Sequence, residues 1–408
     1  MPDNVIEVLS LGYTEPIRDP LWGHIYLTPE IEDLTRTKAF MRLYRISQLG
    51  PASLLYPGAT HSRAAHSIGV YHLTRRLLIN LAERGAAAWL TSEGVRSMLC
   101  AALLHDLGHF PYAHSLKDLP LTDHEVLSGR SIMKEPLRSV LGKTGASPEL
   151  TAAIIDNNLP ANGNKELLFY RKLLSGCLDP DKLDYLNRDA RYCGVPYGAQ
   201  DVDFTISMLY PHIERGVDID SRGISSVESV LFSKYLMYRS VYWHRSVRSA
   251  TSMIKKALFS ALKDGSIRDD DLYALDDNGL FTLLDFLSSS LSALARDVRD
   301  GYLYAVAEEY PFNEAEHGRL EDINEREKEE AVLAEKFSIL TGKKVLPKQV
   351  IIDLPNNPVF ETDLYVLDEE CSFGESSSFF KKHTVASFVK TLRIVRIYVD
   401  RRAGVVKL

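Results

Sequence analysis

The chain has 408 residues, of which 45% are hydrophobic and 25% are charged, so its composition is that of an ordinary globular protein with a substantial core. Its formal net charge of −7 argues against a protein that coats nucleic acid, so any polyanion must be bound by a local group of Arg and Lys. Four cysteines without a Cys-x-x-Cys pair, no signal-peptide pattern and no apolar run of transmembrane length predict a cytoplasmic protein that binds no membrane.

The N-terminal segment has Gly and Pro turn signals around the short apolar stretch 24–27, which predicts a small hairpin. Over residues 30–262 apolar side chains recur at helical spacing. One helical face is marked by Val70, Leu73, Leu77 and Leu81. We therefore expect a mainly α-helical body.

A second helical stripe combines apolar and ionisable residues. It runs through Met98, Ala102, His105 and His109, and Pro111 should end or bend this helix. Because the stripe begins with apolar residues, we expect its histidines to face the interior of the protein.

The central and later parts of the chain alternate between polar breaks and helical patterns. Residues 157–165 contain Pro and Gly among polar residues and predict a loop. The segments 227–262, 280–309 and 314–340 are predicted to be helical, and the last is a charged helix that ends at Gly342.

Beyond that helix the pattern changes. Residues rich in β-branched and aromatic side chains predict strands at 349–353, 363–367 and 393–399, with a Ser-rich turn at 374–378. The predicted fold class is therefore mainly α, with a helical core followed by a smaller C-terminal α+β module.

Histidines are concentrated in one part of the chain. Seven of the twelve lie in a single stretch, namely His61, His66, His72, His105, His109, His114 and His124. On one helix His105 and His109 would share a face that Asp106 can also reach. Burying unpaired ionisable groups costs several kcal/mol each, and a divalent cation removes that cost by taking nitrogen and carboxylate oxygen as ligands. A surface-facing His-x-x-x-His pair without function is the alternative, which this density of histidines disfavours.

Six stretches carry a resemblance to a known family: DPLWGHIYLTPE (19–30), SQLGPASLLYPGATHSRAAHSIGVYHL (47–73), LLHDLGHFPYAHS (103–115), DHE (123–125), LDPDKLDYLNRDARYCGVPYG (178–198) and, more loosely, YRSVYWHRSVR (238–248). In this order they resemble the HD-domain phosphohydrolases, and within them the deoxynucleoside triphosphate triphosphohydrolases of the SAM- and HD-domain type. Too few residues precede the first stretch to hold a SAM domain, so we expect none. The resemblance implies an HD-type catalytic domain over residues 1–270 and a helical and α+β accessory region over residues 271–408.

The resemblance also implies a metal centre. Its four ligands would be His66, His105, Asp106 and Asp181, which together would hold one divalent ion. Nitrogen and oxygen ligands leave the identity of the ion open among Mg, Mn, Fe, Zn and Ni. Such an ion would lower the pKa of a water molecule that attacks the α-phosphorus.

Substrate-binding roles follow from the same resemblance. Arg63, Lys182 and Arg239 would hold the triphosphate, Tyr185 and Asp189 would contact the sugar and its 3′ hydroxyl, and Gln48 and Leu49 would exclude a 2′ hydroxyl. For any one of these residues the alternative is a solvated charge or core packing, which their positions inside matching motifs disfavour.

Acid and base roles would fall to three histidines, His109, His114 and His124. Because His has a pKa near neutrality, one of them should protonate the departing 5′ oxygen or orient a phosphate. Glu125 would fix the tautomer and charge of a neighbouring His. The sequence leaves open which histidine is the acid, and each could instead be structural.

The chain departs from the family pattern at two places. Relatives that need a nucleotide activator bind it through polar residues, where this chain has Arg36, Met41, Tyr44 and Phe204. We therefore expect that activator site to be absent or to bind a different ligand. Val247 stands where a relative has an aromatic residue, so the base preference is expected to be relaxed or different.

The leading hypothesis is an enzyme that splits deoxynucleoside triphosphates into deoxynucleoside and inorganic triphosphate. The alternatives are another HD-type nucleotide phosphohydrolase, such as a phosphodiesterase or a nucleotide phosphatase, and a catalytically silent nucleotide sensor. By analogy with the family we expect a homo-oligomer, either a dimer or a tetramer. Nucleic acid is not required, although Arg239, Arg245 and Arg248 leave its binding as a side activity.

Overall fold

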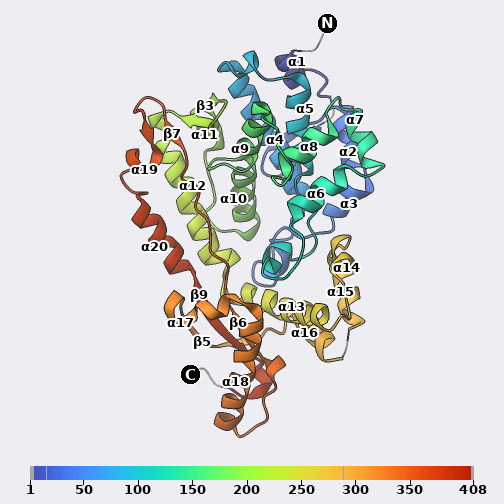
Figure 1. Cartoon of the computed structure of the whole chain (residues 1–408), viewed down its shortest axis with the longest axis vertical. Helices are drawn as coiled ribbons and strands as arrows, with labels where there is room; N and C mark the ends of the chain where they lie inside the picture. The colour runs from blue at the N-terminus through green and yellow to red at the C-terminus, as the bar shows by residue number, and fades with distance from the viewer. Residues whose placement is uncertain (1–3, 15, 288, 406–408) are drawn as a thin grey trace.

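The computed structural model describes residues 4–14, 16–287 and 289–405, and most of these residues are helical (Figure 1). The larger body, in the upper part of the figure, contains α1 (Val5–Ser10), α2 (Pro29–Thr35), α3 (Lys38–Leu43), α4 (Arg63–Glu83), α5 (Ser92–Leu104), α6 (His124–Ile132), α7 (Leu137–Gly142), α8 (Pro148–Ile155), α9 (Lys165–Leu174), α10 (Pro180–Cys193), α11 (Val202–Ser207) and α12 (Ile224–Met237). The predicted N-terminal hairpin is confirmed, since β1 (Pro16–Asp19) pairs antiparallel with β2 (Gly23–Tyr26).

Helix α4 lies at the centre of this body, where it packs against α5 and α10. The four residues predicted to mark its inner face, Val70, Leu73, Leu77 and Leu81, are all buried. Side-chain oxygens of Ser62, Thr91 and Asp179 cap the N-termini of α4, α5 and α10 by accepting from backbone amides. The predicted helical core is confirmed, and residues 157–164 form the expected loop.

Helix α5 ends earlier than its pattern predicted. The structure places its last residue at Leu104, so His105 and Asp106 lie in a turn and His109 is beyond the helix. The prediction of one helix through His109 is therefore wrong. The backbone groups of the turn are bound from elsewhere, because the Ser128 hydroxyl donates to His105 O (2.6 Å) and accepts from Gly108 N (2.8 Å).

The predicted long helix over 227–262 is interrupted. Helix α12 is followed by a π-helical turn over Tyr238–Tyr242, and α13 (Arg245–Lys263) begins after it. A π-turn inserts an extra residue into the helical repeat and rotates the side chains that follow. The interruption turns Tyr238 and Tyr242 toward the cleft described below.

The lower part of Figure 1 contains α13, α14 (Asp270–Tyr273), α15 (Asp277–Asp285), α16 (Ser289–Arg299), α17 (Glu314–His317) and α18 (Ile323–Thr341). Beside them lies an antiparallel sheet in the order β5–β9–β6, formed by β5 (Ala305–Pro311), β6 (Val350–Asp353) and β9 (Ile394–Val399). The strands predicted at 349–353 and 393–399 are confirmed. The single helix predicted over 280–309 is wrong in two respects, since α15 and α16 share its first part and β5 lies at its end. The helix predicted over 314–340 is divided into α17 and α18.

A second sheet joins the C-terminal segment to the larger body. Its order is β3 (Leu209–His212), β4 (Gly216–Ile219), β7 (Tyr365–Val366) and β8 (Cys371–Ser372), with β7 parallel to β4. The strand predicted at 363–367 is thus present as β7, whereas the predicted Ser-rich turn contains the short helix α19 (Phe373–Ser376). Helix α20 (Lys382–Leu392) then packs on α12, where the rings of Tyr235 and Phe388 stack at 4.4 Å.

The fold class is therefore mainly α with small sheets, as predicted. The division at residue 270 stays a proposal. One buried apolar cluster joins α13 to α15 and α16, while Phe360, Leu364 and Val366 belong to the cluster of the larger body. The C-terminal part of the chain thus contributes to both cores.

Close backbone packing at Gly108 gives a prediction for stability. A Cβ on Gly108 would lie 2.1 Å from the His124 carbonyl oxygen and 2.5 Å from the Ser128 amide nitrogen. We expect Gly108→Ala to lower the free energy of unfolding by about 1–3 kcal/mol, because backbone must move to admit the methyl group. The matched control is Gly142→Ala in α7, where no atom lies within 4 Å. This change should be neutral or stabilise by up to about 1 kcal/mol. Urea unfolding followed by circular dichroism measures both, and equal midpoints would contradict the packing argument.

Candidate active site

A cleft of about 580 Å³ runs between the helical body, the π-turn and the segment 354–361. Of the residues that the sequence predicted for the site, those that line it are Gln48, Leu49, Arg63, His66, His105, Asp106, His114, His124, Glu125, Asp181, Lys182, Tyr185 and Asp189. His109 is fully buried behind this lining. The cleft therefore brings together side chains that are more than a hundred residues apart in the chain.

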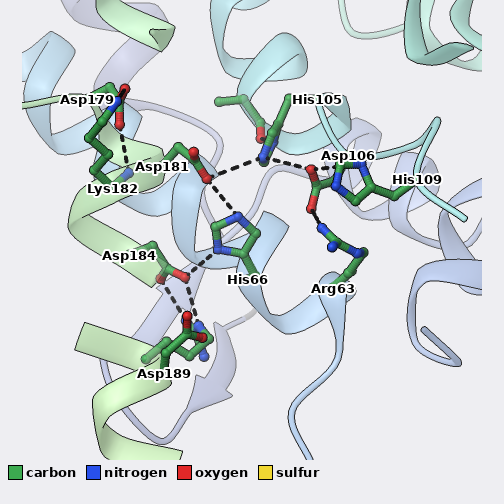
Figure 2. A network of polar contacts seen from close by, with 12 residues as sticks. Arg63, His66, His105, Asp106, His109, Asp179, Asp181, Lys182, Asp184 and Asp189 are labelled. Carbon is green, nitrogen blue, oxygen red and sulfur yellow. Dashed lines mark hydrogen bonds and ion pairs between the residues drawn. The ribbon is translucent and has the colours of Figure 1, made fainter. Parts of the chain in front are cut away.

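Four side chains gather at one point of the cleft wall (Figure 2). The Nε2 atom of His66, on α4, lies 2.9 Å from Oδ1 of Asp181, on α10. His105 Nε2 lies 3.6 Å from the same oxygen and 3.3 Å from Oδ1 of Asp106. The ligand atoms of His66, His105 and Asp181 are all within 4.8 Å of one another, so this group could hold a divalent metal ion.

Hydrogen bonds behind the group fix its orientation. Asp184 Oδ2 accepts from His66 Nδ1 at 2.8 Å, which leaves His66 Nε2 directed at Asp181. Arg188 is completely buried and donates two hydrogen bonds to Asp184, while the Trp22 indole donates a third. The sequence reasoning missed Asp184 and Arg188. Their four-residue spacing on α10 could have indicated an ion pair between them.

The charges of the group suit a cation. Burial alone would lower the pKa of His66, but hydrogen bonds with Asp181 and Asp184 raise it to about 10. Burial alone would raise the pKa of Asp181, but His105 and His66 hold it well below its ordinary value. A divalent ion bound here would compete with the proton on His66, because a histidine must be neutral to act as a ligand.

The fourth expected ligand, Asp106, is shared with an arginine. Its Oδ1 faces His105, while Oδ2 accepts a hydrogen bond from Arg63 Nη1 at 2.8 Å. Arg63 is 4% exposed, and within the described part of the chain its Nε has no hydrogen-bond partner. Arg63 therefore neutralises Asp106 from one side, and its buried Nε is left without a partner among the described residues.

A second group consists of three histidines. His109 Nε2 lies 3.0 Å from His114 Nε2, and the ring centroids of His109 and His124 are 3.8 Å apart. Burial, together with nearby positive charge, holds the pKa of His109 and of His124 well below the ordinary value, so both rings are neutral at pH 7. Among the described residues no hydrogen bond joins Glu125 to a histidine, so its predicted role stays a prediction.

The expected sugar-binding residues lie further along α10. Both carboxylate oxygens of Asp189 are engaged, Oδ1 with His61 Nε2 at 2.8 Å and Oδ2 with the Tyr242 hydroxyl at 2.7 Å. The ring of Tyr185 packs edge-on against Tyr242. The sequence reasoning did not connect His61 or Tyr242 with Asp189, because the three residues come from distant segments.

Arg239 is the predicted substrate residue that the structure does not bring into the cleft. It is exposed and donates from Nη1 to the Tyr235 hydroxyl at 3.1 Å. The π-turn explains this, because it directs the neighbouring Tyr238 and Tyr242 inward. Lys234, one turn earlier on α12, lines the cleft and was missed.

The residues at the expected activator position lie on the surface. Arg36 pairs with Glu32 of its own helix, and Met41, Tyr44 and Phe204 are exposed. The activator prediction itself stays a prediction. None of the described helices has an apolar stretch long enough to cross a membrane.

Comparisons with known proteins identify the class. Residues 63–174 match the family model of the HD domain, and residues 208–396 match that of the HD associated region. The chain is 36% identical over 258 residues to the uncharacterized protein YwfO of Bacillus subtilis, covering 62% of this chain and 57% of that protein. It is 28% identical over 278 residues to deoxynucleoside triphosphate triphosphohydrolase SAMHD1 of Homo sapiens, covering 60% of this chain and 44% of that protein. The chain thus spans about half the length of these curated relatives.

Solved structures share the fold over nearly the whole chain. A hypothetical protein from Aquifex aeolicus matches with a TM-score of 0.73 at 26% identity, covering 95% of this chain and 97% of that one. A phosphohydrolase from Bacteroides thetaiotaomicron matches with a TM-score of 0.74 at 24% identity, covering 95% of this chain and 100% of that one. The helical core and its His/Asp group define an HD domain followed by its associated region. The chain belongs to the HD-domain phosphohydrolase superfamily.

Asp179, the N-cap of α10, and Asp181, in its first turn, predict a difference in metal content. Asp181 faces His66, whereas Asp179 binds Lys182 instead. We expect Asp181→Ala to lose a stoichiometric divalent ion after reconstitution with Mn²⁺. Asp179→Asn, which keeps a capping oxygen for α10, should retain it. Elemental analysis of the reconstituted proteins measures both. Equal metal content in the two variants would show that Asp181 is not a ligand.

Proposed function

We propose that the protein hydrolyses deoxynucleoside triphosphates to deoxynucleoside and inorganic triphosphate. One observation carries the proposal: the His66, His105, Asp106 and Asp181 group lies in the same cleft as Lys182, Tyr185 and Asp189. Hydrolysis needs the first set of residues, and recognition of a deoxynucleotide needs the second. The similarity to SAMHD1, whose name states this activity, supports the same substrate class.

The four residues would hold one divalent ion, and two nitrogens with two carboxylates suit Mg, Mn, Fe, Zn or Ni. When bound, such an ion lowers the pKa of water and draws charge from a phosphate. The donors fit this task because the pKa of both Asp106 and Asp181 is held low by neighbouring positive groups, despite burial. His105 is oriented by a hydrogen bond between its Nδ1 and Ala102 O.

Side chains of the protein would position and neutralise the phosphates. Arg63 and Lys182 both line the cleft, and their positive charges would neutralise part of the phosphate charge. His114 and His124 line the cleft beside them. In the free protein His124 is neutral and can accept a proton. It can act as an acid only when the negative charge of a bound phosphate raises its pKa.

The sugar would lie against Tyr185, with its 3′ hydroxyl donating to Asp189. The His61 and Tyr242 hydrogen bonds hold the Asp189 carboxylate still, which reduces the entropy lost when a hydroxyl binds. Gln48 and Leu49 also line the cleft and would crowd a 2′ hydroxyl.

Product analysis tests the proposal against the other hypotheses from the sequence. Purified protein is incubated with each deoxynucleoside triphosphate and a series of metals, and products are separated by ion-exchange chromatography. We expect inorganic triphosphate from the wild type and none from Asp106→Ala, while Asp285→Ala on the surface should remain active. Stepwise release of phosphate or opening of a cyclic nucleotide would indicate a different nucleotide phosphohydrolase. Tight nucleotide binding without any turnover would indicate a sensor.

The role of Asp189 predicts a substrate-dependent effect. A hydrogen bond to a charged group contributes roughly 1.5–3 kcal/mol, so Asp189→Asn should lower kcat/KM for a deoxynucleotide by about 10- to 100-fold. A 2′,3′-dideoxynucleotide lacks the donor hydroxyl, so its kcat/KM should be low with the wild type and little changed by the substitution. Steady-state kinetics with both substrates measure this. An equal loss for both would mean that Asp189 only supports the fold.

Three further expectations stay predictions: a homo-oligomer, either dimer or tetramer, a cytoplasmic location, and independence from nucleic acid. The oligomeric state can be measured by light scattering of the purified protein. The base preference follows from the product analysis above.

A further inference from the structure

An irregular segment forms one wall of the cleft. Residues 354–364, which we call the strap, connect β6 of one sheet with β7 of the other. Among the described residues, no backbone amide from Asn356 to Asp363 donates to a backbone carbonyl. The strap is held mainly by side chains, since Phe360 is buried against Phe388 and the Arg393 guanidinium donates to Pro355 O. It can therefore move without breaking regular secondary structure.

Two buried lysines meet beneath the strap. Lys182 projects from α10 and Lys234 from α12, and their side chains are only 10% and 6% exposed. Glu361 of the strap joins them, because its Oε1 lies 3.5 Å from Lys182 Nζ and its Oε2 lies 2.9 Å from Lys234 Nζ. Burial favours the neutral acid, but the two ammonium groups lower the pKa of Glu361 and keep it ionised.

The two carboxylates that pair with Lys182, Asp179 and Glu361, are not equivalent. Asp179 is 1% exposed, caps α10 and lies 2.7 Å from Lys182 Nζ. Glu361 is 31% exposed, lies farther from Lys182 and belongs to the irregular strap. Asp179 is therefore a fixed partner of Lys182, whereas Glu361 is a partner that a stronger anion can displace. Without Glu361 the ion-pair partner left to the two lysines within the described part of the chain would be Asp179, and part of their positive charge would be uncompensated.

We propose that Lys182 and Lys234 together bind the polyphosphate of the substrate, and that Glu361 occupies this site as an internal competitor until a phosphate displaces it. The inference rests on the proposed function, because it takes the substrate to be a nucleoside polyphosphate. It adds Lys234 as a phosphate-binding residue and makes the strap part of substrate recognition. Lys234 also donates from Nζ to Val359 O of the strap at 2.6 Å, so a phosphate that displaces Glu361 changes one of two contacts between α12 and the strap and couples polyphosphate binding to the position of the strap.

Calorimetric titration with inorganic triphosphate tests this without hydrolysis. Because Gln has the size of Glu but no charge, Glu361→Gln should bind triphosphate about 10-fold more tightly than the wild type. Lys234→Met should bind it about 10-fold more weakly. The matched control is Glu214→Gln, which removes a surface carboxylate paired with Lys165 and should bind like the wild type.

A second titration uses a deoxynucleoside, which carries no phosphate. It shows whether a substitution alters the binding of phosphate alone or disturbs the whole cleft. The affinity for the deoxynucleoside should be the same in all four proteins. The proposal is wrong if Glu361→Gln binds triphosphate no more tightly than the wild type, or if Lys234→Met weakens the deoxynucleoside as much as the triphosphate. Failure of the proposed function would instead appear as triphosphate binding with the expected shifts but no release of triphosphate from deoxynucleotides.

Discussion

The close approach of α10 to α4 at Gly69 is the constraint on which the site depends. A Cβ at this position would lie 1.9 Å from Asp184 Oδ1 and 2.5 Å from Arg188 Nη2, so only glycine admits both side chains between the helices. There Asp184 accepts from His66 and from Arg188, which offsets the several kcal/mol that an unpaired buried carboxylate would cost. The same contact turns His66 toward Asp181. The orientation of His66 in the candidate metal site is therefore set by the packing of α4 against α10.

Periodicity predicted the fold well where a helix or strand depends on its own sequence. The inner face of α4 and the strands β6 and β9 are examples. The prediction failed where distant segments decided the outcome. Along α5 the helical spacing continues to His109, but Ser128 of α6 and Arg42 bind the backbone carbonyls of the turn, so the helix ends at Leu104. The π-turn between α12 and α13 could not be predicted either, because the hydrophobic pattern continues through it.

The candidate site could be predicted to the extent that short motifs carry it. His66, His105, Asp106 and Asp181 lie in such motifs, and the structure brings them together. Of the residues that orient or balance the predicted ones, Lys234 and Glu361 lie outside the motifs. His61, Asp184, Arg188 and Tyr242 lie inside them, but their partners are set by the fold. Glu361 in particular is placed by the pairing of β7 with β4, which no local sequence signal indicates.

The irregular backbone of the strap also bears on how proteins of this architecture diversify. A segment that donates no ladder hydrogen bonds can lengthen, shorten or exchange residues at a small cost in folding free energy. Helices α4 and α10, which carry His66 and Asp181, have no such freedom, because buried ionic contacts of Asp184 and Arg188 hold them in place. Substitutions in residues 354–364 can thus change the preference for anionic ligands. The His66, His105, Asp106 and Asp181 group need not change with them.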